Sequence, residues 1–220
     1  MSRRCGSTAR RCSAGSGGTP SAKATELPSE PVRVLLEVAG ILDRLGIEYL
    51  LGGSLASSVL GEPRATVDID LAIVLPEASI PELVAALDPA FFVDPEAVRR
   101  AVQRGTSVNV LHRETMLKVD LFVLGDAPFD HEQLGRRVRV EVSPDSSQLV
   151  SLSSPEDLVL RKLAWYRAGG EVSDRQWRDV LGVLKVQRGR LDLAYLERWA
   201  HELGLADLVE RALRESAPGV

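Results

Sequence analysis

Two aspartates inside an apolar run restrict what this chain can fold into. Residues 67–75, VDIDLAIVL, form the most strand-like segment of the 220-residue sequence, yet Asp68 and Asp70 interrupt it. Because side chains of a β-strand alternate between its two faces, we expect both carboxylates on one face and the apolar residues on the other. Two like charges on a half-buried surface repel and lose hydration unless a cation binds between them. The pattern therefore predicts a divalent metal site on a sheet.

The residue types around this segment indicate which metal binds. Carboxylate oxygens on a rigid strand suit Mg²⁺ or Mn²⁺, and no His or Cys is close enough in sequence to indicate zinc. Both cysteines, Cys5 and Cys12, lie near the start of the chain, so the folded part is predicted to contain no disulfide and no thiolate metal site. A magnesium ion in turn indicates a substrate that carries phosphate groups.

A glycine turn precedes the aspartates. Residues 47–51, IEYLL, are predicted to form a short strand that ends at Gly52 and Gly53, and residues 54–60 a short helix. Glycines let the backbone approach a ligand closely, and a helix N-terminus offers free N–H groups and a positive dipole to phosphate oxygens. Ser54 adds a hydroxyl donor. We expect these residues to bind a triphosphate; a plain tight turn is the alternative.

Arg64 and Thr66 lie between the glycine turn and the aspartates. Thr66 is two residues before Asp68, which predicts that it shares the face of that carboxylate. We expect Arg64 to hold the triphosphate, while an ion pair with Glu62 at the surface is the alternative. Both residues therefore belong to the predicted nucleotide-binding set.

A third carboxylate, Asp120, interrupts the apolar strand-like segment 116–124, MLKVDLFVL. Two acids for metal binding and a third that completes a second metal site or accepts a proton from an attacking hydroxyl describe metal-assisted nucleotidyl transfer. Lys118 shares the face of Asp120. It either contacts the substrate or neutralises that carboxylate.

The three motifs, GGS at 52–54, RATVDID at 64–70 and KVDL at 118–121, resemble the DNA polymerase β-type nucleotidyltransferase superfamily. The resemblance is strongest to its minimal bacterial members and to the AbiEii-type toxins of abortive-infection systems, and it covers about residues 47–124. It implies Mg²⁺-dependent transfer of a nucleoside monophosphate from an NTP to an acceptor. In this comparison the three aspartates are the catalytic and metal-binding residues.

The resemblance extends to two later helices. AbiEii-type enzymes carry a lysine on one helix and then a D-x-x-D-like motif, which Lys162 and the segment SDRQWRDVLGVL resemble. This chain reads D-x-x-x-R-D there, and Asp179 is favoured over Asp174 as the functional acid. The alternative is a solvated helix face with two i,i+4 ion pairs, Asp174 with Arg178 and Arg175 with Asp179.

Hydrophobic periodicity predicts an α+β protein with a mixed β-sheet nucleotidyltransferase core and a C-terminal helical bundle. Two strands, 106–114 and 116–124, are predicted to pair as an antiparallel hairpin. Further strands are expected at 136–142 and 148–153, and helices at 31–45, 155–168, 174–187, 191–203 and 205–215. Four aromatic residues fall at helical core spacing and are predicted to pack rather than to stack on a base: Trp165, Tyr166, Trp177 and Trp199.

Composition divides the chain into three parts. Residues 1–28 are predicted to be a disordered basic tail, because they are rich in Ser, Gly and Arg and have little apolar surface to bury. This tail resembles a transit peptide more than a signal peptide, and a start codon assigned too far upstream gives the same composition. Residues 29–153 are expected to form the catalytic domain and residues 154–220 a helical subdomain. No apolar run reaches the roughly 18 residues of a membrane span, so we expect no membrane contact and a cytoplasmic location.

The acceptor stays open at the level of the sequence. A protein side chain, a tRNA 3′ end and a small molecule such as an aminoglycoside all suit this fold. The net charge of −4 gives no global basic surface, so contact with RNA must be local. The family resemblance implies a toxin of a toxin–antitoxin pair, with an antitoxin as its partner. The alternative is a nucleotide-binding or partner-binding protein of the same fold that does not catalyse.

Overall fold

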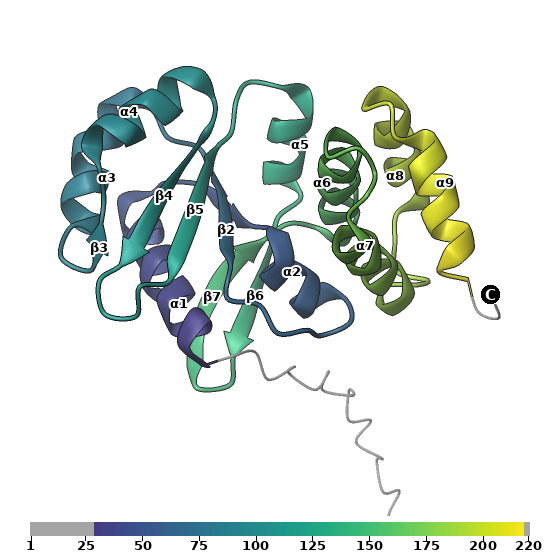
Figure 1. The fold of residues 1–220 in the computed structure, drawn as a ribbon, viewed down its shortest axis with the longest axis horizontal. Coiled ribbons are helices and arrows are strands. Elements are labelled where there is room, and N and C mark those ends of the chain that lie inside the picture. Colours follow the sequence, from purple (N-terminus) through teal and green to yellow (C-terminus); the bar gives the residue numbers. More distant parts are fainter. Residues whose placement is uncertain (1–28, 218–220) are drawn as a thin grey trace, which may run out of the picture.

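A seven-stranded mixed sheet is the framework of residues 29–217, which are the residues that this structure, a computed structural model, describes (Figure 1). The predicted basic tail, residues 1–28, lies outside the described residues. The strands follow the order β3-β4-β5-β2-β1-β7-β6. Their bounds are Tyr49–Leu51 (β1), Ile69–Ile73 (β2), Phe91–Phe92 (β3), Ser107–His112 (β4), Lys118–Val123 (β5), Val138–Ser143 (β6) and Ser146–Leu152 (β7).

Helices precede, connect and follow these strands. The first part of the chain carries α1 (Ser29–Leu45), α2 (Gly53–Leu60), α3 (Ile80–Leu87) after a 3-10 turn at Glu77–Ser79, α4 (Pro95–Arg104) and α5 (Pro128–Gly135). The second part is helical, with α6 (Pro155–Ala168), α7 (Asp174–Val186), α8 (Leu193–Glu202) and α9 (Ala206–Glu215). These last four helices gather on one side of the sheet, as Figure 1 shows. The predicted α+β class is confirmed.

The sheet combines parallel and antiparallel pairs. β1 is antiparallel to β2 and parallel to β7, while β2 runs parallel to β5. β4 and β5 form the antiparallel hairpin that the sequence predicts. In the β2–β5 pair, Asp70 lies directly opposite Asp120, so the two carboxylates come from neighbouring strands at one level of the sheet.

β2 is shorter than the predicted strand 67–75. Its apolar residues Ile69, Leu71 and Ile73 are fully buried, whereas Asp70 is only partly covered, which is the expected alternation. The prediction is wrong at the start of the segment, because Val67 is 57% exposed and the strand begins at Ile69. Asp68 therefore lies in the loop just before β2, free of the strand geometry that holds Asp70.

Helix α6 begins where the sequence predicts a helix. Ser154 accepts a hydrogen bond from the backbone N–H of Asp157 at 3.2 Å, and Pro155 occupies the first turn of α6. Ser173 caps α7 in the same way. One continuous hydrophobic core connects the sheet with these helices. α2 contacts both β2 and α7, which brings the glycine turn next to the bundle.

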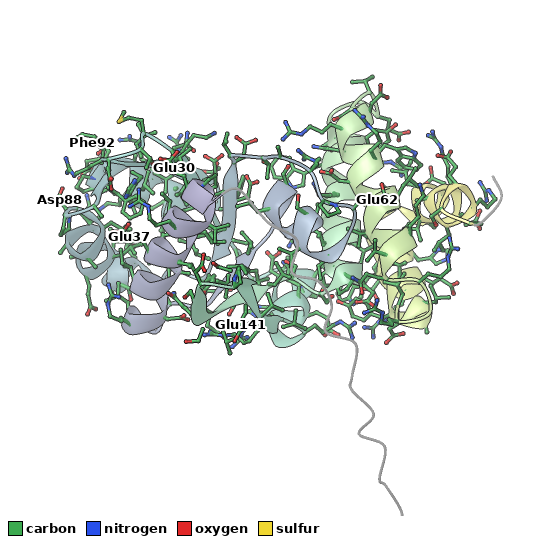
Figure 2. The ribbon with its side chains drawn as sticks, turned by 90° about the horizontal axis from the view of Figure 1, so that it is seen from below. Glu30, Glu37, Glu62, Asp88, Phe92 and Glu141 are labelled. Atoms are coloured by element: carbon green, nitrogen blue, oxygen red, sulfur yellow. The ribbon has the colours of Figure 1, made fainter. Side chains whose placement is uncertain are left out.

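Charged side chains cover the outside of the molecule. Glu30 and Glu141 are exposed, and Glu62 points outward from the loop that follows α2 (Figure 2). Among residues 29–217, no helix combines the length and the apolar character needed to cross a bilayer.

Candidate active site

A cavity of about 770 Å³ lies between the sheet and the C-terminal helices, within the range that is usual for small-molecule sites. The strands, the glycine turn and three helices all contribute to its wall. Of the residues that the sequence selects, eight line it: Gly52, Gly53, Ser54, Arg64, Asp68, Asp70, Lys162 and Asp179. Residues more than a hundred positions apart are thus brought to one site.

The glycine turn is fitted to Asp70. Gly53 has a φ of +59°, and a Cβ at this position would lie 1.8 Å from Oδ2 of Asp70. The backbone N–H of Gly52 donates to the carbonyl oxygen of Asp70 at 2.9 Å, and the backbone of Ser54 acts to lower the pKa of the Asp70 carboxyl against the larger effect of burial. The N-terminus of α2 is therefore directed at this carboxylate, in the position where helix termini bind anions.

Asp70 and Asp120 are neighbours in the sheet. Burial raises the pKa of Asp70, and the charges of Asp120 and Asp68 raise it further. Oδ2 of Asp120 forms an ion pair with Nζ of Lys118 at 2.8 Å. Oδ1 of Asp120 is buried without a hydrogen-bond partner in the described part of the chain. Buried polar atoms are normally paired, so an unpaired carboxylate oxygen next to a second carboxylate fits a cation ligand.

Asp68 has another partner. Its carboxylate is half exposed and lies 3.6 Å from the guanidinium of Arg175 on α7. Within residues 29–217, no group of three or more His, Cys, Asp or Glu side chains is arranged to hold a metal ion. The residue types fit Mg²⁺ and two of the three carboxylates are adjacent, so the magnesium site stays a prediction, with Asp68 as the ligand that must turn from Arg175.

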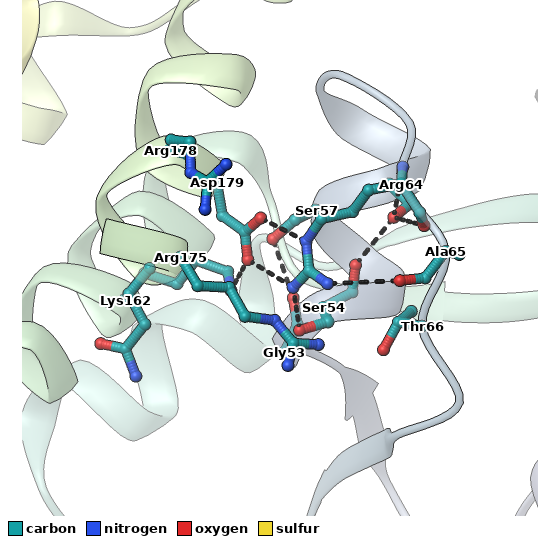
Figure 3. A network of polar contacts seen from close by, with 12 residues as sticks. Gly53, Ser54, Ser57, Arg64, Ala65, Thr66, Lys162, Arg175, Arg178 and Asp179 are labelled. Atoms are coloured by element: carbon teal, nitrogen blue, oxygen red, sulfur yellow. Dashed lines mark hydrogen bonds and ion pairs between the residues drawn. The ribbon is translucent and has the colours of Figure 1, made fainter. Parts of the chain in front are cut away.

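A buried ion-pair network joins α2, α6 and α7. Asp179 binds both Nε and Nη2 of Arg64, at 2.7 and 2.9 Å, and also Nζ of Lys162 at 2.8 Å (Figure 3). Arg64 donates in addition to Oγ of Ser54. Burial by itself raises the pKa of Asp179, but the hydrogen bonds from Arg64 and Lys162 hold that pKa below its ordinary value. Burial lowers the pKa of Lys162.

This network overturns two alternatives that the sequence left open. Arg64 pairs with Asp179 and not with Glu62, which lies 3.9 Å from Lys185 instead. The two i,i+4 ion pairs on α7 are wrong as well, because Arg175 contacts Asp68 and Arg178 donates to the backbone oxygen of Asp174. Asp179 is thus a buried anchor and not part of a solvated face.

Removing the anchor should destabilise the fold. Asp179→Ala leaves Lys162 and Arg64 close together without a counter-charge, and breaking a buried pair in this way costs about 3–5 kcal/mol. Urea unfolding followed by circular dichroism measures the loss. The matched control is Asp174→Ala on the same helix, an exposed residue whose removal should cost less than about 1 kcal/mol. Equal effects of the two changes would contradict a structural role for Asp179.

Acid should remove this contribution. The pKa of Asp179 is lower in the folded protein than in the unfolded chain, where it is about 3.9. The stabilisation is therefore fully present above about pH 4 and is lost as the pH falls through the lower, folded-state pKa. The difference in unfolding free energy between the wild type and Asp179→Ala should shrink below about pH 4. A difference that stays constant there would show that Asp179 is not ionised in the native protein.

Thr66, Lys118 and Asp120 are not among the residues that line the cavity, although Asp120 lies directly opposite Asp70 in the sheet. Thr66 is buried, and its Oγ1 accepts the backbone N–H of Asp68 at 3.3 Å, so it positions the loop before β2. Lys118 neutralises Asp120 and lines a separate shallow depression with Phe92 and Arg113. Thr66 and Lys118 therefore contact Asp68 and Asp120, respectively, from outside the cavity.

One end of the cavity contains residues that the sequence pattern does not indicate. Trp165 was expected to pack in the core, but it is 56% exposed and lines the cavity, unlike the buried Tyr166, Trp177 and Trp199. α5 was not anticipated, and it supplies Asp130 and Gln133 to the same wall. The available signal was the spacing 158, 161, 162 and 165 on α6, which is i, i+3, i+4, i+7 and places these residues on one helix face.

Comparisons with known proteins identify the fold. No family model and no curated protein matches the sequence. The crystal structure of an antigenic nucleotidyltransferase-like protein from Paracoccidioides brasiliensis is similar, with a TM-score of 0.52 and 19% identity, and the match covers 86% of this chain and 94% of that one. The crystal structure of ANT(2'')-Ia in complex with adenylyl-2''-tobramycin matches with a TM-score of 0.50 and 13% identity, over 80% of this chain and 98% of that one. The part of this chain that the structure describes therefore has the nucleotidyltransferase fold.

Proposed function

We propose that this protein is a metal-dependent nucleotidyltransferase that transfers a nucleoside monophosphate from an NTP to an acceptor hydroxyl. The observation that carries the proposal is the pairing of Asp70 with Asp120 across two parallel strands, beside the N-terminus of α2. Burial and the charge of Asp120 raise the pKa of Asp70, and Asp120 has an unpaired buried oxygen, so the two carboxylates form a site for a divalent cation. Such a site next to a helix N-terminus suits a nucleotide with its magnesium.

The residues have distinct roles in this reaction. Asp68, Asp70 and Asp120 hold Mg²⁺, which, when bound, neutralises charge on the attacking and leaving oxygens. The backbone of Gly52 leaves room for the phosphates, and Gly53 leaves room for the carboxylate of Asp70. Asp120 accepts the proton of the acceptor hydroxyl as the oxygen bonds to the α-phosphorus. The bond from that phosphorus to the bridging oxygen breaks, and pyrophosphate leaves.

Arginine and lysine side chains surround the expected position of the triphosphate. Arg64 and Lys162 form the network on Asp179, and Arg175 reaches Asp68 from α7. Positive side chains that can orient a triphosphate thus come from three different elements. Arg64 is fixed by a bidentate ion pair, which gives it a defined direction before any ligand arrives.

A transfer assay tests the proposal. The purified protein is incubated with Mg²⁺, each of the four α-labelled NTPs and one of three acceptors: total RNA, cell lysate protein, or an aminoglycoside, since ANT(2'')-Ia was crystallised with an adenylylated tobramycin. We expect label transfer by the wild type and none by Asp68→Ala/Asp70→Ala, with Asp174→Ala as an active control. NTP binding without transfer to any acceptor would identify a nucleotide-binding protein instead.

The finer proposal concerns the biological role. The similarity of the GGS, DID and KVDL motifs to AbiEii-type toxins supports a toxin of a toxin–antitoxin pair, with an antitoxin protein as its partner. Induced expression of the wild type should then stop growth, and expression of Asp70→Asn should not. Normal growth at equal expression of both proteins would contradict the toxin role and leave the transferase proposal in place.

A further inference from the structure

The cavity continues beyond the carboxylates to an aromatic end. Phe122 lies two residues after Asp120 on the same face of β5, which places it roughly 7 Å further along the strand. Trp165 on α6 packs against it edge-on, with ring centroids 5.7 Å apart. Both rings line the cavity, and the indole is more than half exposed. An exposed aromatic face at this position offers a planar surface to a ligand.

Arg161, one helical turn before Trp165 on α6, lies over the ring of Phe129 and has an unused donor. Nε of Arg161 donates to Oε1 of Gln133 at 3.2 Å, and its Nη2 donates to Asp130. Asp130 also accepts the backbone N–H of Gly125, so its two oxygens are occupied. Among residues 29–217, Nη1 of Arg161 makes no hydrogen bond, although this side chain lines the cavity. The guanidinium is thus held in place, and its Nη1 can donate hydrogen bonds to a ligand but cannot accept them.

An acceptor atom without a partner is also present on the opposite helix. Oε1 of Gln176 on α7 is buried and has no hydrogen-bond partner in the described part of the chain, and the residue lines the same cavity. Buried polar atoms are normally paired, so this oxygen indicates a ligand that brings a donor. Together with the rings and Arg161 it makes a subsite for a planar, polar molecule.

The position of the subsite decides which planar group it takes. The shallow depression contains Lys118, two residues before Asp120 on β5, and Asn109, which lies opposite Asp120 on β4, so an acceptor can reach this carboxylate from there. The aromatic end is enclosed in the same cavity as Gly53 and Ser54. One pentose can span the distance from an α-phosphate beside Asp120 to Phe122. A nucleotide bound by its phosphates at the glycine turn therefore extends its base toward the aromatic end.

Building on the proposed function, we propose that Trp165, Phe122, Arg161 and Gln176 form the nucleobase subsite. The base stacks on Trp165, Nη1 of Arg161 donates to an acceptor on the edge of the base, and Oε1 of Gln176 accepts from a donor of the nucleoside. Stacking is common to all bases, whereas the edge contact with Arg161 sets the preference among them.

Tryptophan fluorescence tests the stacking contact. Trp177 and Trp199 are buried, so quenching by a ligand in the cavity reports on Trp165. Each NTP with Mg²⁺ should quench the emission saturably. Inorganic tripolyphosphate should compete with NTP without quenching. Trp165→Leu should abolish the quenching and weaken NTP binding about tenfold or more, while the affinity for tripolyphosphate stays unchanged. The matched control, Phe92→Leu, changes an exposed aromatic residue outside this cavity and should leave NTP binding as it is.

The outcomes separate this inference from the proposed function. NTP binding that competes with tripolyphosphate, but leaves the emission and the Trp165→Leu affinity unaffected, would place the base elsewhere and overturn the inference alone. Binding of neither ligand would overturn both. Arg161→Lys keeps a cation beside Asp130 but loses the planar guanidinium, so the spread of affinities among the four NTPs should narrow. An unchanged spread would show that Arg161 does not read the base.

Discussion

Asp70→Asn should reduce nucleotidyl transfer about a thousandfold or more, since a bound metal contributes several kcal/mol to transition-state stabilisation and each 1.36 kcal/mol is a factor of ten. The substitution keeps the shape of the side chain and removes its charge. It also removes a charge that burial and the repulsion by Asp120 and Asp68 disfavour, so the variant should be at least as stable as the wild type. Transfer assays with thermal unfolding of the same samples measure both effects.

Asp174→Asn is the matched control for this experiment. It changes the same residue type at an exposed position on α7, outside the cavity, and should leave transfer within about twofold of the wild type. An Asp70→Asn enzyme that retains a tenth of the activity would mean that this carboxylate is not a metal ligand. A variant that is inactive and also unfolds at a much lower temperature would mean that Asp70 is structural.

Gly53→Ala should impair both folding and catalysis. The left-handed backbone at this position costs a non-glycine residue about 1–2 kcal/mol. The new methyl group would also occupy the place of the Asp70 carboxylate, whose Oδ2 lies 1.8 Å from the expected Cβ. A displacement of a catalytic group by about 1 Å can cost a factor of 100, so we expect a loss of transfer of about a hundredfold or more in the fraction that folds.

The neighbouring glycine is the control. Gly52 has a φ of −120°, and a Cβ there would lie 3.9 Å from its nearest neighbour, the backbone oxygen of Asp70. Gly52→Ala should therefore unfold within a few degrees of the wild type. Equal midpoints of thermal unfolding for the two variants would contradict the close fit between Gly53 and the carboxylate.

Periodicity was sufficient to predict most of the fold. Capping residues and apolar spacing predict the helices of the C-terminal bundle, because these signals are local. Ser154 and Pro155, for example, mark the start of α6. Alternation in β2 and β5 likewise predicts Asp70 and Asp120 on the sheet face opposite the buried apolar residues. The alternation did not predict where the strand begins. Asp68 continues the alternating pattern in the sequence, but β2 starts only at Ile69.

The sequence did not predict which residues far apart in the chain form ion pairs. Asp179 has one arginine, Arg175, at i,i+4 spacing on its own helix, yet it binds Arg64, which is 115 residues away in sequence. A buried, bidentate ion pair with Arg64 stabilises Asp179 more than an exposed i,i+4 ion pair would, because the exposed pair contributes only about 0.2–0.5 kcal/mol. Trp165 shows the same limit, because an aromatic residue on an amphipathic helix reads as core whether its face meets a core or a cavity.

Because Gly53 fits closely against Asp70, we expect positions 53 and 70 to change together in evolution. While the carboxylate is present, a side chain at position 53 collides with it; once the carboxylate is gone, only the backbone conformation restricts the residue there. A lineage that abandons catalysis can then exchange the glycine for a residue such as asparagine, which tolerates left-handed backbone. Among homologues, a side chain at position 53 should thus mark the branches in which the chemistry has been lost.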